Sequence, residues 1–201
     1  MVAFIAAIGC GDPPADPGLN NDAVSASVEE PAAAPAIDAP SLREADLGAA
    51  QPAHRAGNVY LSGQPAPEDL AKWAELGVKT VISLRTDGEI DWDEAQAVGQ
   101  QGMTFVSLPF RGADALTDEV FNGAREILRK AEDEPVVLHC ASSNRVGAVW
   151  MAHRVLDEGV DVGRAEREAR EAGLRSDDLL ARARQYIEQH STSPAPAEAT
   201  H

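Results

Sequence analysis

The sequence predicts an α/β fold in which a mostly parallel central sheet of about four to five strands is flanked by helices. Short apolar runs rich in β-branched residues alternate along the chain with longer stretches in which apolar residues recur at helical spacing. Strands that alternate with helices form right-handed crossovers and a parallel sheet with helices on its faces. The chain has 201 residues, which is enough for one domain of ordinary size and some additional terminal sequence.

Short apolar runs are expected to form the strands of this sheet. The run VKTVISL is apolar on both faces, as is typical of a strand buried inside a parallel sheet. Another run, Val136 to Leu138, follows Pro135 and ends in His139 and Cys140. The expected strands cover residues 59–62, 78–84, 103–108 and 136–138.

Helices are expected between and after these strands, and the residues at their ends indicate where several of them begin or stop. Pro67 begins the first helix, with acidic residues in its first turn, and Gly77 ends it. Gly102 ends the second helix, and Thr117 caps the third. The expected helices cover residues 67–76, 91–101, 117–131, 146–158, 162–172 and 176–189.

The two ends of the chain differ from its middle in composition. Residues 1–10 read MVAFIAAIGC, an apolar run too short to span a bilayer and similar at Cys10 to the lipidation box of bacterial lipoproteins. Residues 11–54 are rich in Ala, Pro, Asp and Glu, so we expect a disordered acidic linker there, a folded domain over 55–190 and a disordered tail over 191–201. This order predicts an extracytoplasmic protein of the periplasm or cell envelope that is lipid-anchored through Cys10. The alternative is an apolar N-terminus with no targeting role.

The charge of the chain narrows the classes of partner. A net charge of -16 argues against nucleic acid or an anionic membrane surface as the main partner, so contact with a membrane is expected only through the lipid anchor. The sequence also contains no NTPase-type phosphate-binding loop and no cluster of metal ligands. We therefore expect neither a metal nor another cofactor.

The stretch PVVLHCASSNRVGA, residues 135–148, has the pattern of a strand, a tight loop and a helix. The loop amides and the positive end of the following helix dipole converge on one point, where an anion is expected. A thiol at that point is expected to be ionised at neutral pH, so Cys140 is the predicted nucleophile. The guanidinium of Arg145 can hold two oxygens of a phosphoryl or sulfuryl group. The other predicted anion-binding residues of this stretch are His139, Ala141, Ser142, Ser143 and Asn144.

A parallel sheet predicts which other residues meet this loop. Ligands bind at the carboxyl ends of parallel strands, so the residues just after each strand are expected near Cys140. These residues are 62–64, 85–87 and 109–114. Gln64 and Arg85 are accordingly expected to contact the substrate.

His139, Cys140 and Arg145 form a signature that resembles that of the cysteine-dependent tyrosine and dual-specificity phosphatases. Four residues separate the cysteine from the arginine, and this spacing, together with the stretches YLSGQP and VISLRTDGE, is similar to the bacterial DUF442 family. That family includes the phosphatase-like domain of the beta-lactamase hydrolase-like proteins. The resemblance implies a protein-tyrosine-phosphatase-like fold and hydrolysis of phosphomonoesters through a cysteinyl-phosphate, without a metal. It implies as substrate a phosphorylated protein or a small phosphomonoester.

The resemblance also implies roles for two further residues. His139 would stabilise the thiolate by hydrogen bonding, and a buried neutral imidazole bonded to the backbone is an equally good reading of it. Asp114, on the glycine-containing loop upstream of Cys140, would be the general acid that protonates the leaving oxygen. Asp87 is a rival for this role, and otherwise a turn residue before Gly88.

Two other functions stay open at this point. Rhodaneses share the short cysteine loop, so one alternative is a sulfurtransferase that carries a persulfide on Cys140. The other is a phosphate-binding pseudophosphatase, because Ser143 stands where the family more often has glycine, and Val146 replaces a hydroxyl residue.

Overall fold

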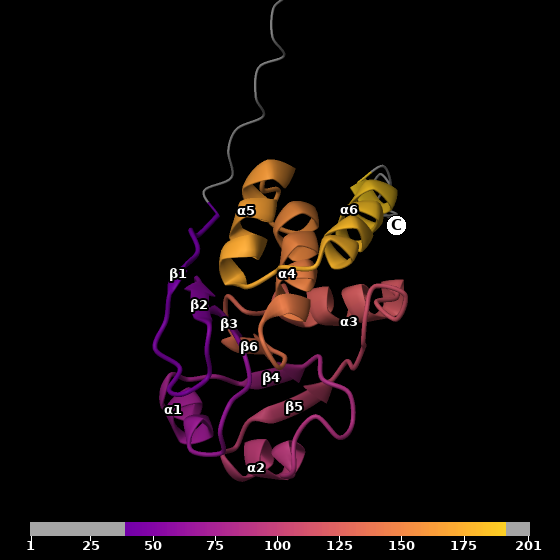
Figure 1. Cartoon of the computed structure of the whole chain (residues 1–201). Coiled ribbons are helices and arrows are strands. Elements are labelled where there is room, and N and C mark those ends of the chain that lie inside the picture. The colour runs from indigo at the N-terminus through magenta and orange to yellow at the C-terminus, as the bar shows by residue number, and fades with distance from the viewer. Residues whose placement is uncertain (1–38, 192–201) are drawn as a thin grey trace, which may run out of the picture. The chain divides into compact units, whose positions relative to one another are not determined.

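A computed structural model of the chain describes residues 39–191, which form a six-stranded sheet with helices on both faces (Figure 1). The strand order is β1-β2-β3-β6-β4-β5, and β3, β6, β4 and β5 are parallel to one another, whereas β1 and β2 pair antiparallel at the β3 edge. The strands are β1 (Arg43–Glu44), β2 (Ala53–Ala56), β3 (Val59–Ser62), β4 (Thr80–Ser83), β5 (Thr104–Ser107) and β6 (Val136–His139). The predicted mostly parallel α/β fold is confirmed, and β6 lies inside the sheet.

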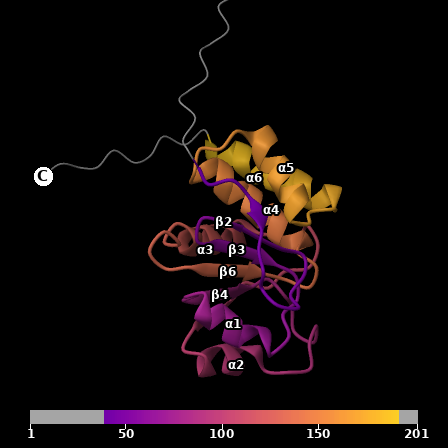
Figure 2. The ribbon, with the colours of Figure 1, turned by 90° about the vertical axis from the view of Figure 1, so that its left-hand side faces the viewer.

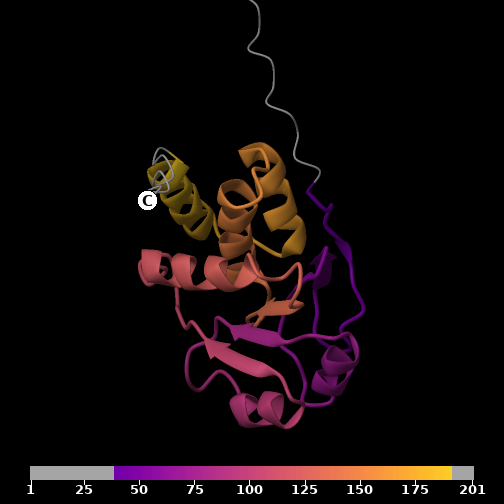
Figure 3. The same cartoon turned by 180° about the vertical axis from the view of Figure 1, so that it is seen from behind.

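The helices of residues 39–191 form two layers. Two short helices lie on one side of the sheet and four longer ones on the other (Figures 1 and 2). Seen from behind, α5 and α6 flank α4 (Figure 3). The first layer is α1 (Asp69–Glu75) and α2 (Glu94–Gln100), and the second is α3 (Asp118–Leu128), α4 (Asn144–Leu156), α5 (Val162–Ala172) and α6 (Asp177–Ser191).

The core is divided in two by the alternation of side chains along the strands. Leu61 and Leu138 belong to the core beneath α4, whereas their chain neighbours Tyr60 and Val137 belong to the core around α1. Helix α4 is buried on all sides over residues 146–154. A helix enclosed in this way is held by packing on every face, so it is a rigid support for the loop that precedes it.

The folded region begins before residue 55, so the prediction of a disordered linker over 11–54 is wrong for its last part. Strands β1 and β2 lie partly or wholly inside that segment. Leu47 and Ala50 between them are fully buried, and Nε1 of Trp73 donates to the carbonyl of Leu47 at 3.1 Å. Sequence reasoning missed these strands because the segment is held by backbone pairing and small side chains, which leave little apolar pattern.

The first helix begins at Asp69, two residues after the predicted start at Pro67. The Asp69 carboxylate accepts hydrogen bonds from the amides of Ala49 at 2.8 Å and Ala66 at 2.9 Å, so it joins the start of α1 to the loop before β2. This long-range contact sets the boundary, and the sequence around Pro67 contains no sign of it.

Two predicted segments lie largely outside residues 39–191, the part of the chain that the structure describes. Residues 1–38, with Cys10 and the expected lipid anchor, and residues 192–201 lie outside the described residues. Ser191, the first residue of the expected tail, is the last residue of α6. Within the described range, no helix has both the length and the apolar character needed to cross a membrane.

Candidate active site

The register of the parallel strands places Cys140 at the carboxyl edge of the sheet. Ser62 of β3 and Ser83 of β4 both pair with His139, so the chain leaves three adjacent strands at one level. The Cys140 amide donates to the carbonyl of Ser62 at 3.4 Å, and the Leu84 amide donates to the carbonyl of His139 at 3.0 Å. The Cys140 side chain therefore sits at the bottom of the loop, and the residue is only 1% exposed.

Ser143 gives the loop its turn. It is the N-cap of α4 and has φ 61°, and no other non-glycine residue of the described range has a positive φ. That conformation costs a serine free energy that a glycine would not lose. A Cβ built on Gly173 would lie 2.9 Å from the Ser143 Cβ, so the absence of a side chain at 173 makes room for Ser143.

The loop carbonyls are held from outside, which leaves the amides directed inward. The Ala141 carbonyl accepts from the Gln64 amide at 3.2 Å, and the Ser142 carbonyl accepts from Arg175 Nη2 at 3.2 Å. Within residues 39–191, no amide from 141 to 146 donates to a backbone carbonyl. These amides and the N-terminus of α4 form a cradle for an anion.

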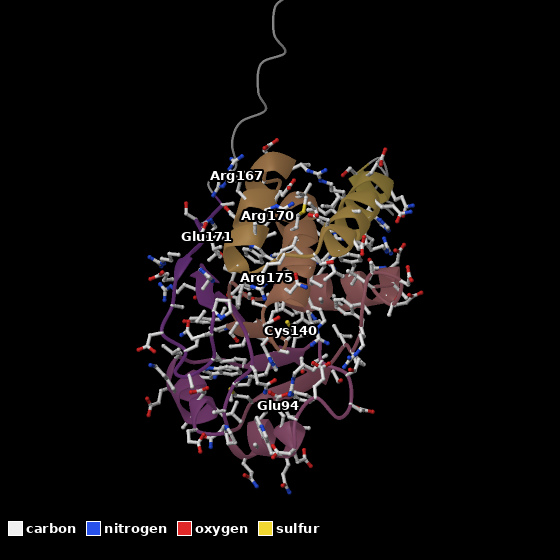
Figure 4. All side chains as sticks on the ribbon, in the orientation of Figure 1. Glu94, Cys140, Arg167, Arg170, Glu171 and Arg175 are labelled. Atoms are coloured by element: carbon white, nitrogen blue, oxygen red, sulfur yellow. The ribbon has the colours of Figure 1, made fainter. Side chains whose placement is uncertain are left out.

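The Asn144 side chain braces the loop. Its Oδ1 accepts from the amides of Arg175 at 2.7 Å and Ser176 at 3.1 Å, at the start of α6. The Oδ1 atom of Asn144 is therefore engaged, while its backbone amide is free of backbone partners. In Figure 4, Cys140 lies between Arg175 on one side and Glu94 on the other.

Arg145 is held by a carboxylate that sequence reasoning missed. Nη1 and Nη2 of Arg145 donate to Oε1 and Oε2 of Glu89 at 2.8 and 2.6 Å, and Nη1 also donates to the carbonyls of Leu84 at 2.9 Å and Phe110 at 3.0 Å. This end-on pairing leaves Nε–H and the second Nη2–H of Arg145 without a partner among the described residues. These two hydrogens form the side-on fork that binds two oxygens of a phosphoryl group.

Arg145 and Glu89 stabilise each other's charged form. The Arg145 guanidinium, then the Thr86 amide and hydroxyl, lower the pKa of Glu89 to about 2 despite burial. Burial lowers the pKa of Arg145, but Glu89 and Cys140 outweigh it, so the pKa is raised. Both Arg145 and Glu89 are therefore charged at neutral pH.

Gln64 and Arg85 bond to each other beside the loop, and their contact with substrate stays a prediction. Arg85 is 7% exposed, and its Nη1 donates to Oε1 of Gln64 at 3.0 Å. Its Nη2 pairs with Glu94, the first residue of α2, which sequence reasoning also missed. The only sign of Glu94 in the sequence was its place after Asp93, which caps α2 through its side chain.

His139, the residue before Cys140, lies against Glu94 of this network. It is fully buried, and its Nε2 is 3.2 Å from Oε1 of Glu94, although neither atom has hydrogen-bond geometry to a partner. Burial raises the pKa of Glu94, but His139 and then Arg85 outweigh it, so the pKa is lowered. His139 thus rests against a carboxylate, in place of the backbone partner that one reading of the sequence expected.

The two candidate general acids are on exposed loops. Asp114 lies in a turn before α3, and Asp87 lies in the loop after β4. Asp118, in the first turn of α3, pairs with Arg182 of α6 at 2.5 Å. The role of Asp114 stays a prediction, because no described contact ties it to the loop.

Comparisons with known proteins agree with this geometry. Residues 55–156 match the model of the family "Beta-lactamase hydrolase-like protein, phosphatase-like domain". The chain is 30% identical over 167 residues to the dual specificity protein phosphatase TpbA of one Pseudomonas aeruginosa strain, covering 82% of this chain and 70% of that protein. For TpbA of another strain the match is 30% over 131 residues, 64% of this chain and only 57% of that protein.

Solved structures show the same similarity. A cysteine-to-serine variant of P. aeruginosa TpbA in complex with pTyr is 26% identical and matches with a TM-score of 0.57, covering 70% of this chain and 91% of that one. A DUF442 protein from Shewanella putrefaciens CN-32 is 19% identical and shares the fold, with a TM-score of 0.60 over 72% of this chain and 97% of that one.

Proposed function

We propose that this chain, which belongs to the family of the phosphatase-like domain found in beta-lactamase hydrolase-like proteins, is a cysteine-dependent phosphatase that hydrolyses phosphomonoesters. The observation that carries the proposal is the cradle itself. Cys140 lies at its bottom, the amides of residues 141–146 are free of backbone partners, and Arg145 keeps a side-on fork open. Such donors match the three non-bridging oxygens of a phosphoryl group.

The reaction proceeds by two in-line displacements. Sγ of Cys140 attacks phosphorus, an S–P bond forms, and the P–O bond to the leaving group breaks while Asp114 gives its proton to the leaving oxygen. Water then attacks the cysteinyl-phosphate, the S–P bond breaks, and phosphate leaves as Asp114 takes back a proton. The loop amides and Arg145 hold the non-bridging oxygens in both steps.

Glu89 prepares Arg145 for this role. An isolated arginine side chain loses rotamer freedom when it binds an anion, whereas the Glu89 pair and the two carbonyl contacts already fix the guanidinium. The network of Gln64, Arg85 and Glu94 fixes the other side of the loop. The cradle is therefore organised before substrate arrives.

The substrate and location extend this proposal. TpbA is a dual specificity protein phosphatase that is known in complex with pTyr, and we assign to this chain the same broad class, a phosphorylated protein or a small phosphomonoester. The lipobox-like sequence at Cys10 supports a lipid-anchored protein of the cell envelope. Mass spectrometry of the membrane fraction tests this location, because an acylated Cys10 at the mature N-terminus is expected, and an unmodified Met1 excludes it.

The alternatives are less well supported. A distorted cradle was the reason to consider a pseudophosphatase, and Gly173 provides the space that Ser143 requires. The family match and the curated relatives are phosphatase-like, which leaves only loop length in favour of a sulfurtransferase.

An assay of two activities separates the three functions. We expect the purified protein to hydrolyse an aryl phosphate and to transfer no sulfur from thiosulfate to cyanide. The Cys140→Ser variant should lose aryl phosphatase activity while it still binds phosphate. Thiocyanate formation that depends on Cys140, or aryl phosphatase activity that survives Cys140→Ser, would contradict the proposal.

A further inference from the structure

We propose that Arg111 forms a second anion subsite beside the loop, so that the enzyme prefers phosphomonoesters that carry another phosphate or carboxylate close to the scissile group. The inference rests on the proposed phosphatase function. A hollow of about 280 Å³ opens next to the loop, and its charged lining residues are Glu89, Arg111 and Arg145. The hollow thus begins at the guanidinium that holds the scissile phosphoryl group.

The Glu89 carboxylate in this hollow already accepts several hydrogen bonds. Oε1 of Glu89 accepts from the Thr86 amide at 2.7 Å, from the Thr86 hydroxyl at 2.8 Å and from Arg145 at 2.8 Å. Oε2 of Glu89 accepts from Arg145 at 2.6 Å. A carboxylate oxygen offers about two acceptor positions, so Glu89 has little capacity left for another cation.

The Arg111 guanidinium faces this carboxylate without bonding to it. Its Nη2 is 3.9 Å from Oε1 of Glu89, which is too long for a hydrogen bond, and 3.4 Å from the Thr86 hydroxyl. Its side chain is 75% exposed. Arg111 and Arg145 therefore approach the same Glu89 oxygen, but only Arg145 hydrogen-bonds to it, and most donors of Arg111 stay available to a ligand.

The balance of charge favours an anion at this place. Two arginines and one carboxylate line the hollow, which leaves one positive charge in excess in a chain whose net charge is -16. The loop between β5 and α3 carries Arg111, so this cation sits on a different element from the cradle. A phosphoryl group on the Arg145 fork and a second anion on Arg111 would both lie in this hollow.

Matched substrates test the subsite. We expect the wild type to hydrolyse a phosphotyrosine peptide with an adjacent Glu about 3- to 10-fold faster in kcat/KM than the same peptide with Gln, and to prefer 3-carboxyphenyl phosphate over phenyl phosphate. The peptide pair and the aryl pair distinguish a protein from a small-molecule source. Arg111→Gln should reduce both preferences to about 1 and leave phenyl phosphate turnover within about 2-fold of the wild type.

Arg167→Gln is the matched control, because Arg167 is an exposed arginine of α5 that lies farther from Cys140 than Arg175 does in Figure 4. It removes the same charge and should preserve both preferences. Fluorescence anisotropy of the two peptides on Cys140→Ser protein measures the selectivity without turnover. A wild type that hydrolyses all four substrates without preference, or an Arg111→Gln variant that weakens all of them equally, overturns the subsite. A wild type inactive on every phosphate overturns the phosphatase function instead.

Discussion

Two arginines, one fully buried and one partly buried, lie at opposite ends of helix α4 and have different contacts. Arg154, near the C-terminus, is fully buried, and all three of its guanidinium nitrogens are bonded: Nε and Nη2 to Glu168, Nη1 to Glu158, and Nη2 also to the carbonyl of Pro40. Arg145, in the first turn, is 13% exposed and keeps its side-on fork open. One arginine joins elements of the fold, and the other is fixed in order to bind.

The distribution of unmet polar groups follows the same division. Among residues 39–191, six buried side-chain atoms lack a hydrogen-bond partner, and four of them belong to Glu94, His139 and Ser143 around the loop. The other two are Nδ1 of His54 and Nε1 of Trp150. Buried polar atoms without partners lower stability, so the carboxyl edge of the sheet around Cys140 is locally less well satisfied than the rest of the described core.

The largest effect is expected when the open fork is removed. Arg145→Lys replaces a planar fork with a point charge and should lower kcat/KM for an aryl phosphate by about 10⁴-fold. Steady-state kinetics measure the loss. The midpoint of thermal unfolding should fall less in this variant than in the Arg154→Met variant described next. A loss of less than about 10-fold would mean that the fork does not bind the phosphoryl group.

Replacing Arg154, whose guanidinium nitrogens are all bonded, should lower stability and leave activity nearly unchanged. Arg154→Met removes a fully buried cation from Glu168 and Glu158, which keep only Arg164 and His153, and leaves the Pro40 carbonyl without its donor. It should lower the free energy of unfolding by about 3 kcal/mol. Urea denaturation measures this change. The folded variant should keep kcat/KM within about 2-fold of the wild type. A loss of activity with unchanged stability would contradict the structural role assigned to Arg154.

Removing the proposed general acid should have an effect that depends on the substrate. Asp114→Asn is expected to lower kcat by about 10²-fold for phosphate esters with poor leaving groups and much less for nitrophenyl phosphate. A plot of log kcat against leaving-group pKa measures this dependence, and Asp87→Asn is the matched control. An unchanged slope for Asp114→Asn, or a changed slope for Asp87→Asn, assigns the role elsewhere.

Weakening the contact that holds Arg145 should lower activity less than replacing Arg145 itself. Glu89→Gln retains one acceptor and should lower kcat/KM by about 10-fold, mainly through kcat, since the guanidinium must then be ordered in each turnover. Because the pKa of Glu89 is about 2, its protonation should not appear in the pH-rate profile above about pH 4. A titration near neutral pH that disappears in Glu89→Gln contradicts this ionisation state.

The smallest effect is a pH dependence of stability that comes from His153, near the C-terminus of α4. Burial lowers the pKa of His153, but Asp157 at 3.0 Å and Glu158 at 3.0 Å outweigh it, so the pKa is raised above 6.5. The stabilisation from the charged imidazole is present below pH 6.5 and is lost as the pH rises through the raised value. Thermal unfolding between pH 6 and 9 should show a decline that His153→Asn reduces, and an unchanged decline in that variant contradicts the assignment.

The sequence predicted the fold and the centre of the site because their signals are local. The apolar run before Cys140 and the spacing to Arg145 place nucleophile and guanidinium on one strand–loop–helix unit, and the structure brings them together. The surrounding contacts depend on side chains distant in sequence. Glu89 reaches Arg145 across 56 positions, so nothing local to either residue indicated the pair.

The partners of Arg85 and Gln64 and the early strands were not visible in the sequence. Arg85 and Gln64 were placed correctly at the carboxyl edge of the sheet, but their side chains turn to each other and to Glu94. Strand order alone gives the position of a residue, whereas the partner that its side chain selects depends on the packing of α2 against the sheet. The early strands were missed because backbone pairing leaves little trace in composition.

Trapping the intermediate tests the central claim most directly. Wild-type protein is mixed with an aryl phosphate, quenched in acid during turnover, digested and examined by mass spectrometry. The account predicts one phosphoryl group on the peptide that contains Cys140, and none in the Cys140→Ser variant. A phosphoryl group on another residue, or continued turnover by Cys140→Ser, would contradict it.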